Sequence, residues 1–115
     1  MAQYHEVNLS SKVKDQARAL NSLKEEIEAI DWYNQRADVC GDTELKSILE
    51  HNRDEETEHA VMLFEWLRRN MPAFEKEAAD YLFTKGSLLD LESQADAKEE
   101  EPKEEKEDSD NIFLK

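Results

Sequence analysis

The chain has 115 residues, 38% of them apolar and 38% charged, and its net charge is −14. This length provides one small domain with a shallow core, and the negative charge argues against a nucleic acid or an anionic membrane surface as partner. Two glycines and two prolines favour helices over a β-fold, which needs many tight turns. No apolar run reaches the roughly 18 residues of a membrane span, and the first ten residues lack the apolar core of a signal peptide. We therefore expect an all-α cytoplasmic protein whose partners are cations or other proteins.

A first long helix is predicted over about residues 8–40, after a flexible N-terminus of residues 1–7. Apolar side chains recur there every three or four positions, as on one face of an amphipathic helix. They are Val13, Ala17, Leu20, Leu23, Ile27, Ile30 and Ala37. Gly41 ends this helix, and Cys40, the only cysteine, cannot form a disulfide within the chain.

A second long helix is predicted to run to about Asn70, with Asp42 or Thr43 as its N-cap and Pro72 stopping it. Its apolar stripe consists of Leu45, Ile48, Leu49, Leu63, Trp66 and Leu67. Because only a few residues connect the two long helices, we expect them to be antiparallel neighbours.

The C-terminal third changes character twice. A short helix is predicted with Phe74, Ala78, Tyr81 and Leu82 on one face, and the helical domain extends over residues 8–91. Residues 92–110 contain ten acidic residues, three lysines and no aromatic or β-branched residue, so a disordered acidic linker is expected. Residues 111–115, Asn-Ile-Phe-Leu-Lys, are compatible with a short docking peptide or with a frayed terminus.

The two long helices predict self-association. A hairpin of this length cannot cover its own apolar stripes, and the chain contains no second pair of long helices to pack against it. We therefore expect the hairpin to dimerise into a four-helix bundle.

Three polar residues interrupt this apolar pattern. Glu56 and His59 lie on the apolar stripe of the second helix, and their i,i+3 spacing places both side chains on one face. Glu26 lies on the first helix at the edge of the seam. A Glu together with a Glu-x-x-His pair is half of the ligand set of di-iron carboxylate bundles. A symmetric dimer would supply the other half.

Other interpretations of these residues remain open. Glu-x-x-His occurs by chance in charged helices, although its position on an apolar stripe favours a metal site. Tyr33, on the same side as Glu26, is compatible with an ordinary core residue and with one that supports the metal ligands or their redox chemistry. Glu25 and Glu28 face away from the seam, where a solvated surface or a further subunit would meet them. His5 and His51 are expected at the surface.

Three functions therefore have to be weighed. Oxygen and imidazole ligands suit iron, manganese or zinc, and do not select among them. A redox enzyme acting at a metal centre, a metal-binding module without turnover and a metal-free adaptor bundle all fit the helical pattern.

Three segments resemble the encapsulated ferritins, the ferritin-like cargo proteins of encapsulin nanocompartments. They are EEIEAIDWYNQRAD (25–38), ILEHNRDEETEHAVMLFEWLRRN (48–70) and YLFTKG (81–86). The resemblance implies a ferroxidase that oxidises Fe(II) to Fe(III) at a two-iron centre formed across a homodimer. It further implies assembly of the dimers into a ring-shaped decamer that supplies iron mineral to the interior of an encapsulin shell.

The resemblance also assigns roles to individual residues. It implies that Glu26, Glu56 and His59 bind iron, with Tyr33 close by. Glu25, Glu28 and Trp32 would form a secondary site, or one through which metal enters, at a further interface. The family usually ends in a flexible linker and a short encapsulation peptide, as residues 92–115 do, but the glycine common in such peptides is absent here.

Overall fold

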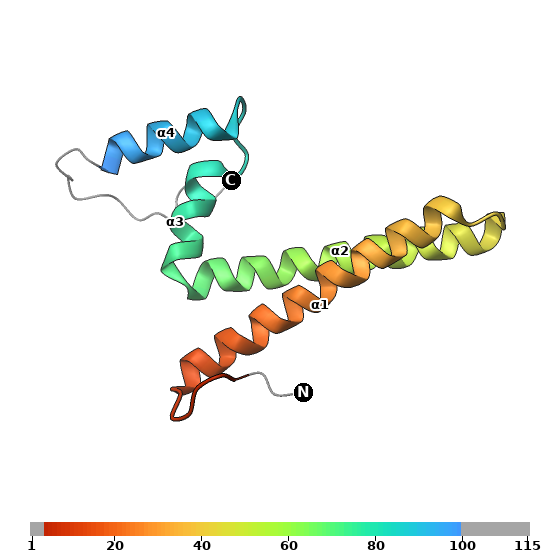
Figure 1. Cartoon of the computed structure of the whole chain (residues 1–115), viewed down its shortest axis with the longest axis horizontal. Helices are drawn as coiled ribbons and strands as arrows, with labels where there is room; N and C mark the ends of the chain where they lie inside the picture. The colour runs from red at the N-terminus through yellow and green to blue at the C-terminus, as the bar shows by residue number, and fades with distance from the viewer. Residues whose placement is uncertain (1–3, 100–115) are drawn as a thin grey trace. The chain divides into compact units, whose positions relative to one another are not determined.

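The computed structural model describes residues 4–99, and all regular structure in that range is helical (Figure 1). The helices are α1 (Ser11–Val39), α2 (Thr43–Asn70), α3 (Pro72–Tyr81) and α4 (Leu88–Glu99). The chain divides into two units, residues 1–70 with α1 and α2 and residues 71–115 with α3 and α4. The all-α prediction is confirmed. Within residues 4–99, no helix has both the length and the apolar composition needed to span a lipid bilayer.

Helix α1 begins three residues later than predicted. Asn8 has a φ of 64°, in the left-handed region, so the helix cannot run through it. The Ser10 hydroxyl then accepts a hydrogen bond from the amide of Val13 at 3.2 Å, which satisfies one of the free amides of the first turn. The serine cap therefore sets the start of α1.

Residues 40–42 connect α1 to α2, and the two helices form an antiparallel hairpin (Figure 1). Asp42 is the N-cap of α2, because its Oδ1 accepts the amide of Leu45 at 2.8 Å and its carbonyl accepts the amide of Lys46 at 2.9 Å. Of the two caps that the sequence allowed, the aspartate is the one used.

Small side chains occupy the buried positions of the α1–α2 seam. Ala19 and Ala37 of α1 and Ala60 of α2 are buried, and Leu67 of α2 has no exposed surface. Most of the buried apolar positions of the hairpin are thus occupied by alanine, whose small side chain allows helix backbones to approach closely.

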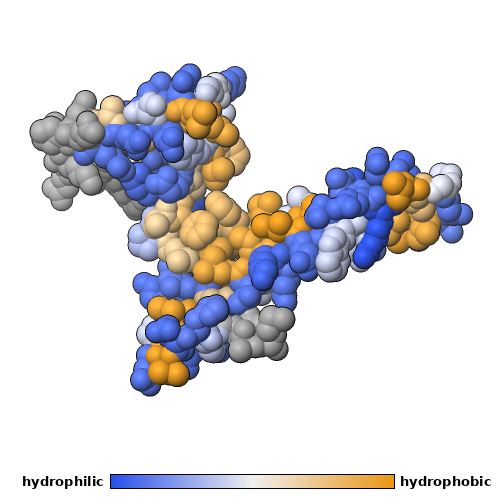
Figure 2. Space-filling view, in the orientation of Figure 1, coloured by the Kyte–Doolittle hydropathy of each residue, from blue (hydrophilic) through white to orange (hydrophobic). Residues whose placement is uncertain are grey.

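The predicted apolar stripe of α1 divides into two lines. Ala37 is buried and Leu23 and Ile30 are half-buried, whereas Leu20 and Ile27 are exposed, Ile27 by 55%. Ile27 was expected at the centre of the seam, and the helix is instead rotated so that the neighbouring Glu26 side faces α2. The stripe of α2 behaves similarly, with Leu45, Ile48 and Trp66 exposed. Figure 2 shows such apolar side chains on the surface of the hairpin, including at the end where α1 and α2 are connected.

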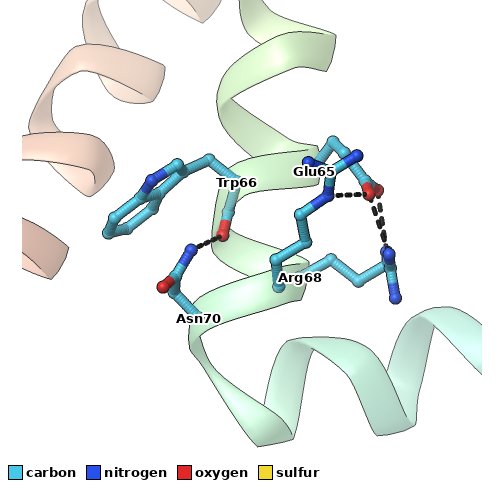
Figure 3. A network of polar contacts seen from close by, with 5 residues as sticks. Glu65, Trp66, Arg68 and Asn70 are labelled. Atoms are coloured by element: carbon cyan, nitrogen blue, oxygen red, sulfur yellow. Dashed lines mark hydrogen bonds and ion pairs between the residues drawn. The ribbon is translucent and has the colours of Figure 1, made fainter. Parts of the chain in front are cut away.

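Charged side chains form a network at the C-terminal end of α2 (Figure 3). Arg68 donates two hydrogen bonds to the Glu65 carboxylate at 2.7 and 2.8 Å, and Arg69 donates a third at 2.7 Å. These bonds, from Arg68 first and then from Arg69, lower the pKa of Glu65 to about 2. The two arginines also lie where the C-terminal end of the helix dipole favours positive charge.

The second unit contains two helices where the sequence predicted one. Pro72, which was expected only to stop the second long helix, lies in the first turn of α3, and α3 ends shortly before Phe83, whose φ is 59°. Helix α4 then covers residues 92–99, which were expected to be disordered linker. Residues 100–110 of that linker and the docking segment 111–115 lie outside the described residues.

Local interactions explain α4. The Ser87 hydroxyl accepts the amide of Asp90 at 3.3 Å, and the helix contains mainly leucine, alanine and glutamate, which favour helix. Lys76 of α3 contacts the Glu99 carboxylate at 2.6 Å and that of Asp80 at 3.1 Å. A segment with little apolar surface to bury can therefore still form a helix, through its cap, its helix-favouring residues and ion pairs.

Candidate metal centre

Helices α1 and α2 bring Glu26, Glu56 and His59 together in the middle of the seam. One ligand atom from each lies within 4.8 Å of the others. His59 Nδ1 lies 3.7 Å from Glu26 Oε1 and 3.9 Å from Glu56 Oε2. The three residues selected from the sequence therefore form one group, contributed by both helices of a single chain.

Two contacts between α1 and α2 fix the register that places these ligands opposite one another. Towards the connected end of the hairpin, Arg53 donates a hydrogen bond to the Asn34 side chain at 3.1 Å. At the other end, Gln16 donates to the carbonyl oxygen of Asn70 at 2.9 Å. A slide of one helix along the other would break both bonds and separate Glu26 from His59.

The electrostatics of the group are unfavourable without a cation. Glu26 Oε2 is buried and has no hydrogen-bond partner among the described residues. The pKa of Glu26 is raised because the nearby Glu56 carboxyl favours a proton shared between them, and burial and repulsion from Glu56 add to this, while His59 acts in the opposite direction. A cation bound among the three would take the place of that proton and satisfy the buried oxygen.

The donor set fits a small transition-metal ion. Two carboxylates and one imidazole are the oxygen and nitrogen donors that iron, manganese and zinc accept. Three protein ligands from one chain leave coordination positions open, either for a second set of protein ligands or for a small reactant.

A second group shares His59. Ligand atoms of Glu55, Glu58 and His59 also lie within 4.8 Å of one another, with both glutamates exposed. Exposed acidic groups of this kind are common without a bound metal ion. Here the two exposed carboxylates add negative potential beside the centre.

The residues predicted for an outer site lie apart from this centre. Glu25, Glu28 and Trp32 are all exposed on α1, Trp32 by 50%. Within the described part of one chain, no third metal ligand joins the two glutamates. A site built on them would need ligands from another subunit, as the sequence interpretation supposed.

Tyr33 is half-buried on the α1 face that also carries Glu26. The guanidinium carbon of Arg36 lies 5.6 Å from the centre of the Tyr33 ring and 5.7 Å from that of Trp32. The sequence interpretation gave Arg36 no role, although its spacing of three and four residues from two aromatic residues was a usable signal.

The remaining candidates occupy peripheral positions. His51 is exposed and lies 3.6 Å from Glu55, and His5 is also exposed. The Cys40 thiol donates a weak hydrogen bond to the carbonyl of Asp42 at 3.6 Å, in the connection between the helices. None of these three joins the Glu26–Glu56–His59 group.

The chain resembles known proteins over the residues that include α1 and α2. Residues 2–85 match the EncFtn-like family. A "Ferritin-like protein" of Thermotoga maritima is 54% identical over 94 residues, which cover 80% of this chain and 82% of that protein. An "Encapsulated ferritin-like protein" of Rhodospirillum rubrum is 48% identical over 85 residues, covering 74% of this chain but only 61% of that longer protein. A crystal structure of a protein from Nitrosomonas europaea superposes with a TM-score of 0.73 at 56% identity, covering 76% of this chain and 98% of the other.

Proposed function

The chain belongs to the EncFtn-like family, and on that premise we propose that it is a ferroxidase, an enzyme that oxidises Fe(II) to Fe(III). Fe(II) is the substrate, and dioxygen or peroxide accepts the electrons. Glu26, Glu56 and His59 bind the iron, and two such sets form a centre for two iron ions across a homodimer.

The observation that carries this proposal is the convergence of the three ligands. They come from two helices, lie in the middle of the α1–α2 seam, and include a buried carboxylate oxygen that has no hydrogen-bond partner within residues 4–99. An unpaired buried carboxylate is costly, and such groups are usually paired or bound to a metal. Fe(III) has a higher charge than Fe(II), so anionic oxygen ligands stabilise the oxidised product more than the substrate.

The dimer completes both the fold and the ligand set. Val13, Leu20 and Ile27 are exposed along one line of α1, seven residues apart, which is nearly two helical turns. A second hairpin covering this line would form a four-helix bundle. A two-fold axis would then bring the partner's own copy of the ligand set opposite the first.

Residues around the centre have supporting roles in this proposal. Tyr33 lies close to the iron ligands, while Glu25, Glu28 and Trp32 form a secondary site, or one through which metal enters, where another subunit meets α1. The dimers associate further into a ring-shaped decamer.

The destination of the oxidised iron is proposed from the relatives. One of them is named an encapsulated ferritin-like protein, and we infer that this chain likewise works inside an encapsulin shell. The acidic segment after α4 would act as a tether, and residues 111–115 would bind the shell.

The experiment is aerobic oxidation of Fe(II), followed by absorbance of the Fe(III) product, with matched pairs of variants. Glu56→Gln is paired with Glu44→Gln, and His59→Ala with His51→Ala, because each pair changes one residue type on the same helix. Loss of one ligand should lower the initial rate at least ~10-fold, as changes even in outer residues of metal sites do. The Glu44 and His51 variants should retain the wild-type rate.

Native mass measurement with and without Fe(II) separates the alternatives. Stoichiometric metal uptake without oxidation would identify a metal-binding module. Assembly that neither needs nor binds metal would identify an adaptor bundle. Variants of Glu26, Glu56 and His59 that oxidise iron as fast as wild type would refute the assigned centre.

A further inference from the structure

Arg36 links two aromatic residues that face different surroundings. Its guanidinium carbon lies within 6 Å of the ring centres of both Trp32 and Tyr33, at 5.7 and 5.6 Å, which is the range of a cation–π contact. Trp32 is exposed on the outer side of α1, whereas Tyr33 is half-buried on the side of the candidate metal centre. One cation therefore contacts both rings.

The position of Tyr33 gives this contact a consequence for the centre. Tyr33 follows Glu26 by seven residues, so it lies nearly two turns further along the same face of α1. Side chains on a helix lean towards its N-terminus, and the Tyr33 ring therefore extends in the direction of Glu26. Any restriction of that ring restricts where its hydroxyl can lie relative to the carboxylates.

We propose that Arg36 is a positioning residue that orients Tyr33 beside the Glu26–Glu56–His59 group. The inference rests on the proposed ferroxidase function, which it deepens. Arg36 lies too far along the helix to belong to the ligand group itself, and it acts through the Tyr33 ring. Its contact with Trp32 helps to hold the guanidinium in place, because the planar group lies close to both rings.

A purely structural role for Arg36 makes a different prediction. Arg36 is in the last turn of α1, where any positive side chain interacts favourably with the helix dipole. Lysine would preserve that interaction but would lose the planar stacking of the guanidinium. A dipole effect should thus be rescued fully by Arg36→Lys, and a positioning effect only in part.

The test is a double-mutant cycle in the full-length chain, with Arg36→Gln, Arg36→Lys, Tyr33→Phe and the double variant Tyr33→Phe/Arg36→Gln. Arg18→Gln is the matched control, because Arg18 is an exposed arginine of α1 paired with Asp15. Far-UV circular dichroism and native mass establish that fold and assembly are unchanged. The readouts are kcat and KM for Fe(II) oxidation, and near-UV circular dichroism in the tyrosine region without metal.

The expected result is a fall in kcat of about two- to fivefold for Arg36→Gln, the size of one exposed cation–π contact, with KM unchanged. Arg36→Lys should be intermediate, and the near-UV tyrosine signal should weaken in Arg36→Gln. In the Tyr33→Phe background, Arg36→Gln should have no further effect, because the hydroxyl through which it acts is gone.

Three results would overturn the inference: a wild-type kcat for Arg36→Gln, full rescue by lysine, or the same loss in both backgrounds. Failure of the proposed function looks different, since the wild-type chain would then oxidise no iron. In that case an unchanged near-UV signal in Arg36→Gln would overturn the positioning role as well, whereas a weakened signal would support the orientation of Tyr33 by Arg36.

Discussion

The middle of the α1–α2 seam and its two ends are built from opposite kinds of residue. At the ends, Ala37 and Leu67 are buried and apolar, and they contribute to stability in the ordinary way. In the middle, Glu26 is only 22% exposed at its side chain and faces Glu56 and His59. Both regions lie on the same pair of helices and on the same seam.

The difference separates a part of the seam that stabilises the fold from a part that does not. Within the described residues one oxygen of the half-buried Glu26 carboxylate has no hydrogen-bond partner, which destabilises the free chain. The ends of the seam offset this cost, because they hold the helices together whether or not a cation is bound. Substitutions at the ends and in the middle of the seam should therefore have different effects on stability and on metal binding.

The largest effect is expected at an end of the seam, where Leu67 has no exposed surface. Leu67→Ala should lower the free energy of unfolding by about 2–5 kcal/mol, through lost burial and the cavity left behind. Urea denaturation in the presence of a chelator measures it. Val39→Ala, at an exposed position of α1 outside the line of Val13, Leu20 and Ile27, is the control and should cost clearly less; equal losses would mean that the burial of Leu67 does not stabilise the seam.

In the middle of the seam, a substitution by an apolar residue should raise the free energy of unfolding instead of lowering it. Glu26→Leu replaces a partly buried carboxylate by an apolar side chain and should raise the stability of the metal-free chain by about 2 kcal/mol. Added metal should raise the melting temperature of the wild type and should not raise that of this variant. Glu25→Leu, at the exposed neighbouring position, should change metal-free stability little.

A Glu26→Leu variant that is less stable than wild type without metal would contradict this assignment. It would mean that the carboxylate contributes favourable interactions within the free chain. The middle of the seam would then be part of the structural core, as its ends are.

At the connected end of the hairpin, Asp42→Ala should cost about 1 kcal/mol, because the amide of Leu45 loses the side chain that caps it. Asp42→Asn retains an accepting oxygen and should be close to wild type. Thermal unfolding followed by circular dichroism compares the two. A large effect on metal binding in Asp42→Ala, with little change in stability, would instead show that the end of the seam tunes its middle.

Sequence periodicity predicted the elements that depend on local chemistry. The hairpin, a cap at Asp42 or Thr43, the stop at Pro72 and the identity of the three converging residues all follow from spacing along one helix at a time. A glutamate and a histidine on an apolar stripe stand out because such residues are expensive to bury.

Features that depend on contacts between elements were harder to predict. The rotation of α1 that exposes Ile27 and turns Glu26 inward goes together with the burial of Ala19, Ala37 and Ala60, and alanine carries little signal in an apolar pattern. Helix α4, by contrast, was missed although its main signals are local: the Ser87 cap and residues that favour helix can be read from the sequence, and the ion pair between Glu99 and Lys76 of α3 only adds to them.

The smallest effect concerns the ion network at the C-terminal end of α2. The Glu65 pKa is lowered to about 2 by hydrogen bonds from Arg68 and then Arg69, below the ordinary value of 4.5. A lowered pKa in the folded state means that the interaction stabilises the fold above about pH 4.5, and that this stabilisation is lost as the pH falls towards 2. Since the Glu65 side chain is 39% exposed, solvent screening limits the contribution to about 0.5 kcal/mol.

The measurement is the difference in unfolding free energy between wild type and Glu65→Gln, taken from pH 6 down to about pH 2 in chelator. The difference should be largest above pH 5 and should vanish near pH 2, because glutamine has no proton to lose. A difference that stays constant over this range would mean that Glu65 acts through packing rather than charge. The metal-free stability gain of Glu26→Leu should be unchanged in the Glu65→Gln background, since the two residues lie in separate regions of the seam and share no partner.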